Sequence, residues 1–121
     1  MKTRKIGELT VSAVGMGCMA FSHGYGQIPP EKYSIEAIQN ACRHGCTFFD
    51  TAEIYSPNLS GTGHNERIVG KALRDVRQNI VLATKLFLDR SEVRSAGSVY
   101  DAIRRHLDSS LDRLQTDMVD L

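Results

Sequence analysis

Residues 47–50 (TFFD) and 80–84 (IVLAT) are two short apolar runs, and the first is followed by a long polar loop. The second run is apolar on both faces, which is typical of a buried strand in a parallel sheet. Between them, residues 65–74 carry apolar side chains at helical spacing. The sequence therefore predicts a β-α-β unit with parallel strands and a right-handed crossover.

The same alternation extends outward from this unit in both directions. We expect a hairpin over residues 5–14, a strand over 14–19, a helix over 31–44, a helix that begins at Ser98, and a fourth strand over 117–121. Ser98 and Asp101 have the Ser-x-x-Asp spacing of a helix start. Two architectures fit this α/β pattern: an open doubly wound sheet, or the first half of a (β/α)8 TIM barrel.

Length and composition indicate an ordinary globular domain. The chain has 121 residues, 41% of them hydrophobic, and a formal net charge of +1. This balance argues against partners such as nucleic acid or a membrane surface, which need a basic excess. No apolar run approaches the roughly 20 residues of a membrane span, and the N-terminus does not resemble a signal peptide. Three cysteines suit a reducing compartment, so we expect a cytoplasmic protein.

Polar side chains gather where the predicted strands end. Asp50 ends one strand, Lys85 ends the next, and Tyr55 lies in the loop after Asp50. Side-chain alternation puts Asp50 on the face of Phe48, and Lys85 on the face of Ala83. A neighbouring ammonium favours the phenolate form of a tyrosine, so Tyr55 would be a usable general acid. The residues alone leave open a solvated lysine, a turn-capping aspartate and a tyrosine that packs in a loop.

Two other groups of charged or potentially metal-binding residues have no predicted function. Residues 42–46 (CRHGC) cross from a helix end into a strand, so their side chains diverge and we expect no metal site. The predicted third helix carries a mixed set of charges that we expect to form a solvated face: Arg104, Arg105, Arg113, Asp101, Asp108 and Asp112.

Several ordered motifs resemble the aldo-keto reductases. They are residues 15–19 (GMGCM), 48–55 (FFDTAEIY), 63–73 (GHNERIVGKAL), 81–85 (VLATK) and 111–121 (LDRLQTDMVDL). The resemblance runs over the whole chain and implies a (β/α)8 barrel. We therefore expect residues 1–121 to form one partial aldo-keto reductase barrel, its N-terminal half. It would contain a leading hairpin, four parallel strands and three helices, and stop at the fourth strand.

The resemblance also implies a reaction, the NADPH-dependent reduction of an aldehyde or ketone to an alcohol. Tyr55 would protonate the carbonyl oxygen of a small carbonyl substrate while hydride arrives at carbon. Lys85 would tune Tyr55, and Asp50 would hold Lys85. The residues that the resemblance places near the nicotinamide ribose are Gly17, Cys18, Met19 and Asp50.

The chain departs from the family pattern at its end. In the family, an active-site histidine follows the fourth strand, so its position falls beyond Leu121. None of the four histidines of this chain occupies it: His23, His44, His64 and His106, of which His106 is expected on the barrel exterior. We expect the chain alone to be inactive and to self-associate through its open strand edges. The alternative is a non-catalytic α/β binding or assembly module.

Overall fold

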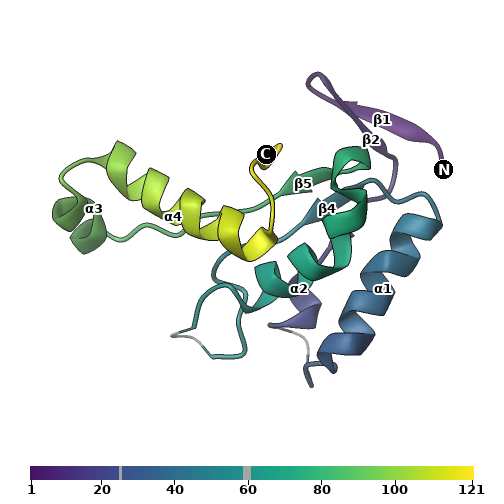
Figure 1. Ribbon diagram of the computed structural model, residues 1–121, viewed down its shortest axis with the longest axis horizontal. Coiled ribbons are helices and arrows are strands. Elements are labelled where there is room, and N and C mark those ends of the chain that lie inside the picture. Colours follow the sequence, from purple (N-terminus) through teal and green to yellow (C-terminus); the bar gives the residue numbers. More distant parts are fainter. Residues whose placement is uncertain (25, 59–60) are drawn as a thin grey trace.

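A three-stranded parallel sheet organises the computed structural model, which describes residues 1–24, 26–58 and 61–121 (Figure 1). Its strands are β3 (Met16–Gly17), β4 (Phe48–Asp50) and β5 (Val81–Ala83), in that order. The register sets Gly17 beside Asp50, and Asp50 beside Ala83. The carboxyl ends of all three strands therefore meet at one end of the sheet, as the sequence predicts.

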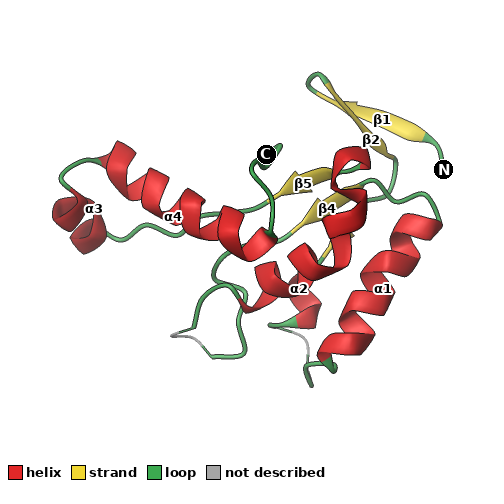
Figure 2. Ribbon diagram, viewed as in Figure 1, coloured by secondary structure: helices red, strands yellow, loops and turns green. Residues whose placement is uncertain are grey.

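Two helices cover one face of this sheet, α1 (Glu31–Arg43) and α2 (His64–Leu73) (Figure 2). The middle residues of the strands, Phe49 and Leu82, are buried in the same core as these helices. The other buried members of this core are Cys18, Ile38, Cys46, Ile68, Val69, Ala72, Leu73, Ile80 and Leu114. Over the described part of the chain, no helix is both long and apolar enough to cross a membrane.

The predicted third helix is α4 (Val99–Leu114), and it begins as expected. The Asp101 backbone N–H donates to the Ser98 hydroxyl at 3.0 Å. Gly70 on α2 lets α4 approach closely, because a methyl group there would lie 2.7 Å from the Leu114 carbonyl. The short 3-10 helix η2 (Arg74–Asn79) joins α2 to β5.

A further helix, α3 (Arg90–Ala96), corrects the expectation of three helices. Asp89 caps it by accepting from the backbone N–H groups of Ser91 at 2.6 Å and Glu92 at 2.8 Å. The Glu92 carboxylate in turn accepts a hydrogen bond from the Asp89 N–H at 3.0 Å, and the pair forms a capping box. No residue of α3 is buried, so it has no apolar face for periodicity to reveal.

The predicted hairpin is present as β1 (Thr3–Ile6) and β2 (Leu9–Ser12), which pair antiparallel. Gly7 supports the two-residue turn with a φ of +56°. The strand that follows is shorter than the predicted range 14–19. Val14 is exposed, and Met19 already begins the 3-10 helix η1 (Met19–Phe21).

The predicted fourth strand lies beside β5, but residues 117–121 do not form a regular strand. The Asp120 N–H donates to Leu82 O at 2.9 Å, and the Thr84 N–H donates to Leu121 O at 3.1 Å. Just before these contacts along β5, the Leu82 N–H donates to the Asp120 carboxylate at 2.8 Å instead of to a main-chain carbonyl. The Asp120 side chain thus replaces one main-chain hydrogen bond between this segment and β5. Arg77 Nη2 lies 2.8 Å from the Asp120 carboxylate and holds it in place.

Candidate active site

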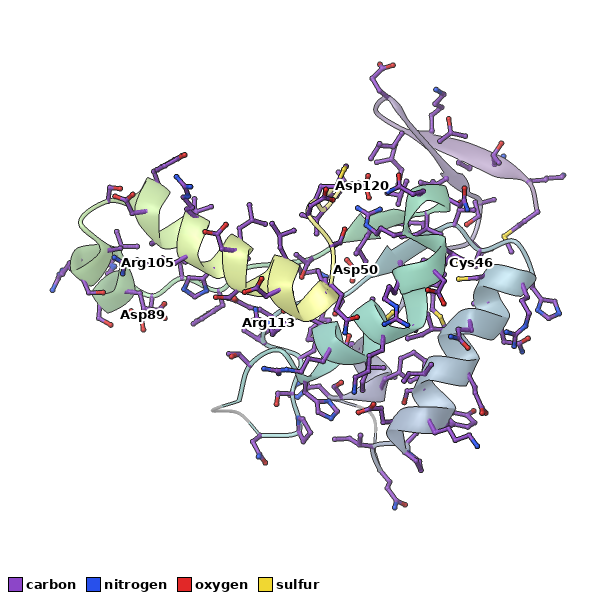
Figure 3. All side chains as sticks on the ribbon, in the orientation of Figure 1. Cys46, Asp50, Asp89, Arg105, Arg113 and Asp120 are labelled. Carbon is purple, nitrogen blue, oxygen red and sulfur yellow. The ribbon has the colours of Figure 1, made fainter. Side chains whose placement is uncertain are left out.

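Asp50 and Lys85 form an ion pair at the carboxyl end of the sheet, where Figure 3 labels Asp50. Lys85 Nζ donates to the two Asp50 carboxylate oxygens at 2.6 and 2.7 Å, and to Thr51 O at 3.0 Å. The same ammonium lies 5.3 Å from the centre of the Tyr55 ring. The structure therefore brings together the three side chains that the sequence placed at the strand ends.

The environment keeps Lys85 charged. Partial burial lowers the pKa of Lys85, but the hydrogen bonds and charge of Asp50, with a contribution from Tyr55, outweigh it. The net effect raises the pKa of Lys85 above its ordinary 10.5. A permanent ammonium thus faces the Tyr55 ring at neutral pH.

Main-chain hydrogen bonds carry the sheet pairing into the loops and fix these side chains. The Thr51 N–H donates to Ala83 O at 2.9 Å, and the Glu53 N–H donates to Lys85 O at 3.1 Å. Farther along the loop, Tyr55 O accepts from the Asn65 N–H at 3.1 Å, at the start of α2. The Tyr55 loop is therefore tied to both β5 and α2.

A hollow of about 410 Å³ opens beside Tyr55. Its lining is mostly apolar and consists of Met19, His23, Ile54, Tyr55 and Phe87. Such a lining suits a small apolar molecule that presents one polar group to the phenol. A second hollow of about 420 Å³ lies between α1 and η2 and contains none of the predicted site residues.

The predicted cofactor loop divides into exposed and buried parts. Gly17 is exposed, with no atom within 4 Å of the place where a methyl group would stand, and Met19 is half-buried at the hollow. Cys18 is fully buried, and burial, with a smaller contribution from the charge of Asp50, raises the pKa of its thiol to about 12. Its N–H donates to Asp50 O and its C=O accepts from Asn65, so Cys18 presents no free polar group to a ligand.

A buried polar network, which no sequence motif predicted, locks this loop to α2. Asn65 Nδ2 donates to Cys18 O and to the Ser22 hydroxyl, each at 2.8 Å. Its Oδ1 accepts from the Thr51 hydroxyl at 2.7 Å, and His64 Nδ1 contacts the Ser22 hydroxyl at 2.8 Å. The partners are separated by up to 47 residues, so no local pattern announces them.

Replacing Asn65 with Leu is expected to destabilise the fold and loosen residues 18–22. Each buried polar group left without a partner costs about 1–3 kcal/mol. Leucine branches like asparagine but is larger, so some overpacking adds to the loss. Urea unfolding measures the loss. Asn79→Leu, at an exposed position of η2, is the control. Equal stability losses in the two variants would contradict the role given to this network.

A second buried network corrects one expectation about the last helix, the solvated position of Arg113. Arg113 is not on a solvated face: its side chain is 13% exposed and its Nε donates to Glu66 Oε2 at 2.6 Å. His106 lies on α4, and its Nδ1 lies 2.9 Å from both Glu53 oxygens. Figure 3 labels Arg113 near the C-terminal end of α4. The sequence contains no local signal for these pairs, which join residues 47 and 53 positions apart.

Residues 42–46 cross from the end of α1 toward β4. Gly45 ends α1 with a φ of +85°, and it separates an exposed His44 from a buried Cys46. Among the described residues, no three His, Cys, Asp or Glu side chains are grouped so that they could hold a metal ion.

Comparison with known proteins identifies the family. The sequence model described as "Aldo/keto reductase family" matches residues 13–121. The chain belongs to the aldo/keto reductase family. This aldo/keto reductase chain is 36% identical over 124 residues to "Aldo-keto reductase yakc [NADP(+)]" of Schizosaccharomyces pombe, covering 98% of the chain and 35% of the relative. It is 34% identical to "Uncharacterized oxidoreductase YqkF" of Bacillus subtilis, covering all of the chain and 38% of that relative.

Solved aldo-keto reductases share the fold. The holo form of an enzyme from Bacillus halodurans superposes with a TM-score of 0.70 at 32% identity, covering 98% of this chain and 38% of that one. An enzyme from Klebsiella pneumoniae in complex with NADP and acetate gives a TM-score of 0.69 at 32% identity, covering 92% and 34%. The chain thus spans 34–38% of the length of these four relatives. Its fold is that of the N-terminal half of a (β/α)8 barrel.

Proposed function

We propose that Asp50, Tyr55 and Lys85 are the catalytic residues of an NADPH-dependent reduction of aldehydes or ketones to alcohols. The observation that carries this proposal is the Lys85 ammonium, held 2.6 Å from the Asp50 carboxylate and facing the Tyr55 ring. These side chains stand at the carboxyl end of the strands, where barrel enzymes place their active sites. Membership of the aldo/keto reductase family supports the same reaction class.

The residues present fit part of a nicotinamide cofactor site. Gly17 leaves open space at the end of β3, and the register places it beside Asp50. Met19 lines the neighbouring hollow, which leaves Gly17, Met19 and Asp50 as the candidates to contact NADPH. Cys18 would support that contact only through its buried packing. The fission yeast relative is named for NADP(+), which supports NADPH as the cofactor here. When bound, NADPH supplies the hydride.

Each side chain then has a separate role in the proposed reaction. Tyr55 donates its phenolic proton to the carbonyl oxygen, so that the product is a neutral alcohol. Lys85 stabilises the negative charge left on the Tyr55 oxygen. Asp50 orients Lys85 through two hydrogen bonds and keeps the ammonium charged. Ile54 and Phe87 give the hollow an apolar wall beside the carbonyl.

The 121-residue chain by itself is expected to show no carbonyl reduction and to bind NADPH weakly. Oriented binding supplies about 7–11 kcal/mol of a barrier in well-placed reactions, and this chain covers 35% of the length of the fission yeast relative. Fluorescence titration with NADPH and an NADPH oxidation assay measure both properties. Micromolar affinity for NADPH, or measurable turnover, would overturn this expectation if the intact mass shows that the chain consists of residues 1–121.

A non-catalytic assembly module is the second candidate, and exposed apolar side chains support it. Val14 lies exposed just before β3, and Met118 and Leu121 lie exposed in the segment beside β5. Apolar groups next to sheet edges promote association. We therefore expect the 121-residue chain to sediment as a dimer or larger species at micromolar concentration. A soluble species that stays monomeric would count against this self-association.

A further inference from the structure

Glu53 joins the two loops that carry Tyr55 and Lys85. It lies two residues before Tyr55, and its main-chain N–H donates to Lys85 O at 3.1 Å. Its carboxylate accepts a hydrogen bond from the backbone N–H of Phe87, two residues after Lys85. The main chain and the side chain of Glu53 therefore hold the Lys85 loop at two points, one on each side of Leu86.

The Glu53 carboxylate is buried, and α4 supplies its polar partners. Its side chain is 4% exposed, so an unpaired negative charge there would be costly. His106 Nδ1 lies 2.9 Å from both carboxylate oxygens, and because a carboxylate only accepts, Nδ1 is the donor. Arg113 Nη2 lies 3.7 Å from the same carboxylate. Both partners project from α4.

Arg113 is itself fixed and reaches the other side of Lys85. Its Nε donates to Glu66 Oε2 at 2.6 Å, and the second Glu66 oxygen accepts from the Thr84 hydroxyl at 2.7 Å. Gly63 makes room for the arginine stem, because a methyl group there would overlap Arg113 Cδ. Helix α4 is thus linked to the Lys85 loop through two buried carboxylates. Glu66 connects it to Thr84, before the lysine, and Glu53 connects it to Phe87, after the lysine.

We propose that Glu53 is a positioning residue, which α4 holds in place through His106 and Arg113 so that the Tyr55 and Lys85 loops keep a fixed separation. This inference rests on the proposed roles of Tyr55 and Lys85 in the reaction. The alternative is that the contacts of His106 and Arg113 only attach α4 to the rest of the fold and do not position the two loops. We call this alternative a fastening role. A fastening role predicts that any weakening of α4 acts alike on the two loops.

The test compares Glu53→Gln with Leu114→Ala in the 121-residue chain by NMR. Leu114 is buried near the end of α4 and its substitution weakens that helix without touching the Glu53 carboxylate. The two readouts are the ring signals of Tyr55, assigned with Tyr55→Phe, and hydrogen exchange of the Phe87 amide. Neither requires turnover, so their outcome is independent of whether the chain reduces carbonyls.

In Glu53→Gln we expect the Tyr55 ring signals to shift or broaden and the Phe87 amide to exchange about tenfold faster or more. In Leu114→Ala, at comparable loss of stability, we expect both readouts to stay close to the parent chain. Equal changes in the two variants, or unchanged signals in a folded Glu53→Gln, overturn the proposal. If Glu53→Gln does not fold, His106→Ala removes one contact to the same carboxylate. Unchanged Tyr55 and Phe87 signals in folded His106→Ala then overturn it equally.

Discussion

Tyr55→Phe is expected to lower carbonyl-dependent NADPH oxidation by about 10²–10⁴-fold in a complete barrel, the range that the loss of a general acid typically costs. The complete barrel is a chimera in which this chain replaces the matching segment of the fission yeast relative, to which it is 36% identical. The variant keeps the ring that faces Lys85 and removes only the hydroxyl. NADPH affinity should therefore change little, and the loss should fall on turnover.

Tyr33→Phe is the matched control, because Tyr33 is exposed on α1 and far along the chain from the loop after β4. It should leave turnover of the chimera unchanged. Near-normal turnover in Tyr55→Phe would sink the assignment of Tyr55 as proton donor. A loss of equal size in both variants would point to a general effect on the chimera instead.

Arg113→Met is expected to lower the free energy of unfolding by about 3–5 kcal/mol, the usual cost of removing one partner from a buried ion pair. The reason is Glu66, which is fully buried and would lose its counter-charge with the arginine gone. Methionine preserves much of the apolar stem, so packing next to Gly63 changes less than charge does. Urea unfolding of the 121-residue chain measures the difference.

Arg104→Met on the same helix is the control for this substitution. Arg104 is 67% exposed and lies 3.9 Å from Asp108, so its ion pair is worth at most about 1 kcal/mol. Comparable losses in the two arginine variants would show that the buried pair has no special weight. A further test is Arg113→Met with Glu66→Leu, which should recover part of the loss because no buried charge is then left unpaired.

The sheet and its main helices could be predicted from the sequence because each has a strong local signal. The apolar run around Leu82 and the capped helix start at Ser98 are local features, and the structure confirms both. Helix α3 was missed although Asp89 and Glu92 have capping-box spacing, since a helix without buried residues has no apolar face. The segment at Asp120 is irregular because the Asp120 side chain accepts a hydrogen bond from the Leu82 N–H in place of a main-chain carbonyl. The spacing of apolar residues gives no sign of such a replacement.

The candidate site was predictable only in part. Asp50 ends β4 and Lys85 follows the neighbouring parallel strand β5, so topology alone brings the two side chains together, and the structure does so. The networks that support them join residues far apart in the chain. Glu66 and Arg113, 47 positions apart, look in the sequence like two ordinary charges on exposed helix faces. Their burial follows from how α2 and α4 pack, which the sequence patterns do not specify.

Carbonyl-dependent NADPH oxidation by the unsubstituted chimera tests the central claim most directly, because it asks whether Asp50, Tyr55 and Lys85 of this chain form a working site. NADPH fluorescence first establishes that the chimera folds and binds the cofactor. We expect it to consume NADPH only when an aldehyde or ketone is present, with one alcohol formed for each NADPH oxidised. A chimera that binds NADPH yet leaves it unoxidised with a panel of aldehydes and ketones would contradict the account.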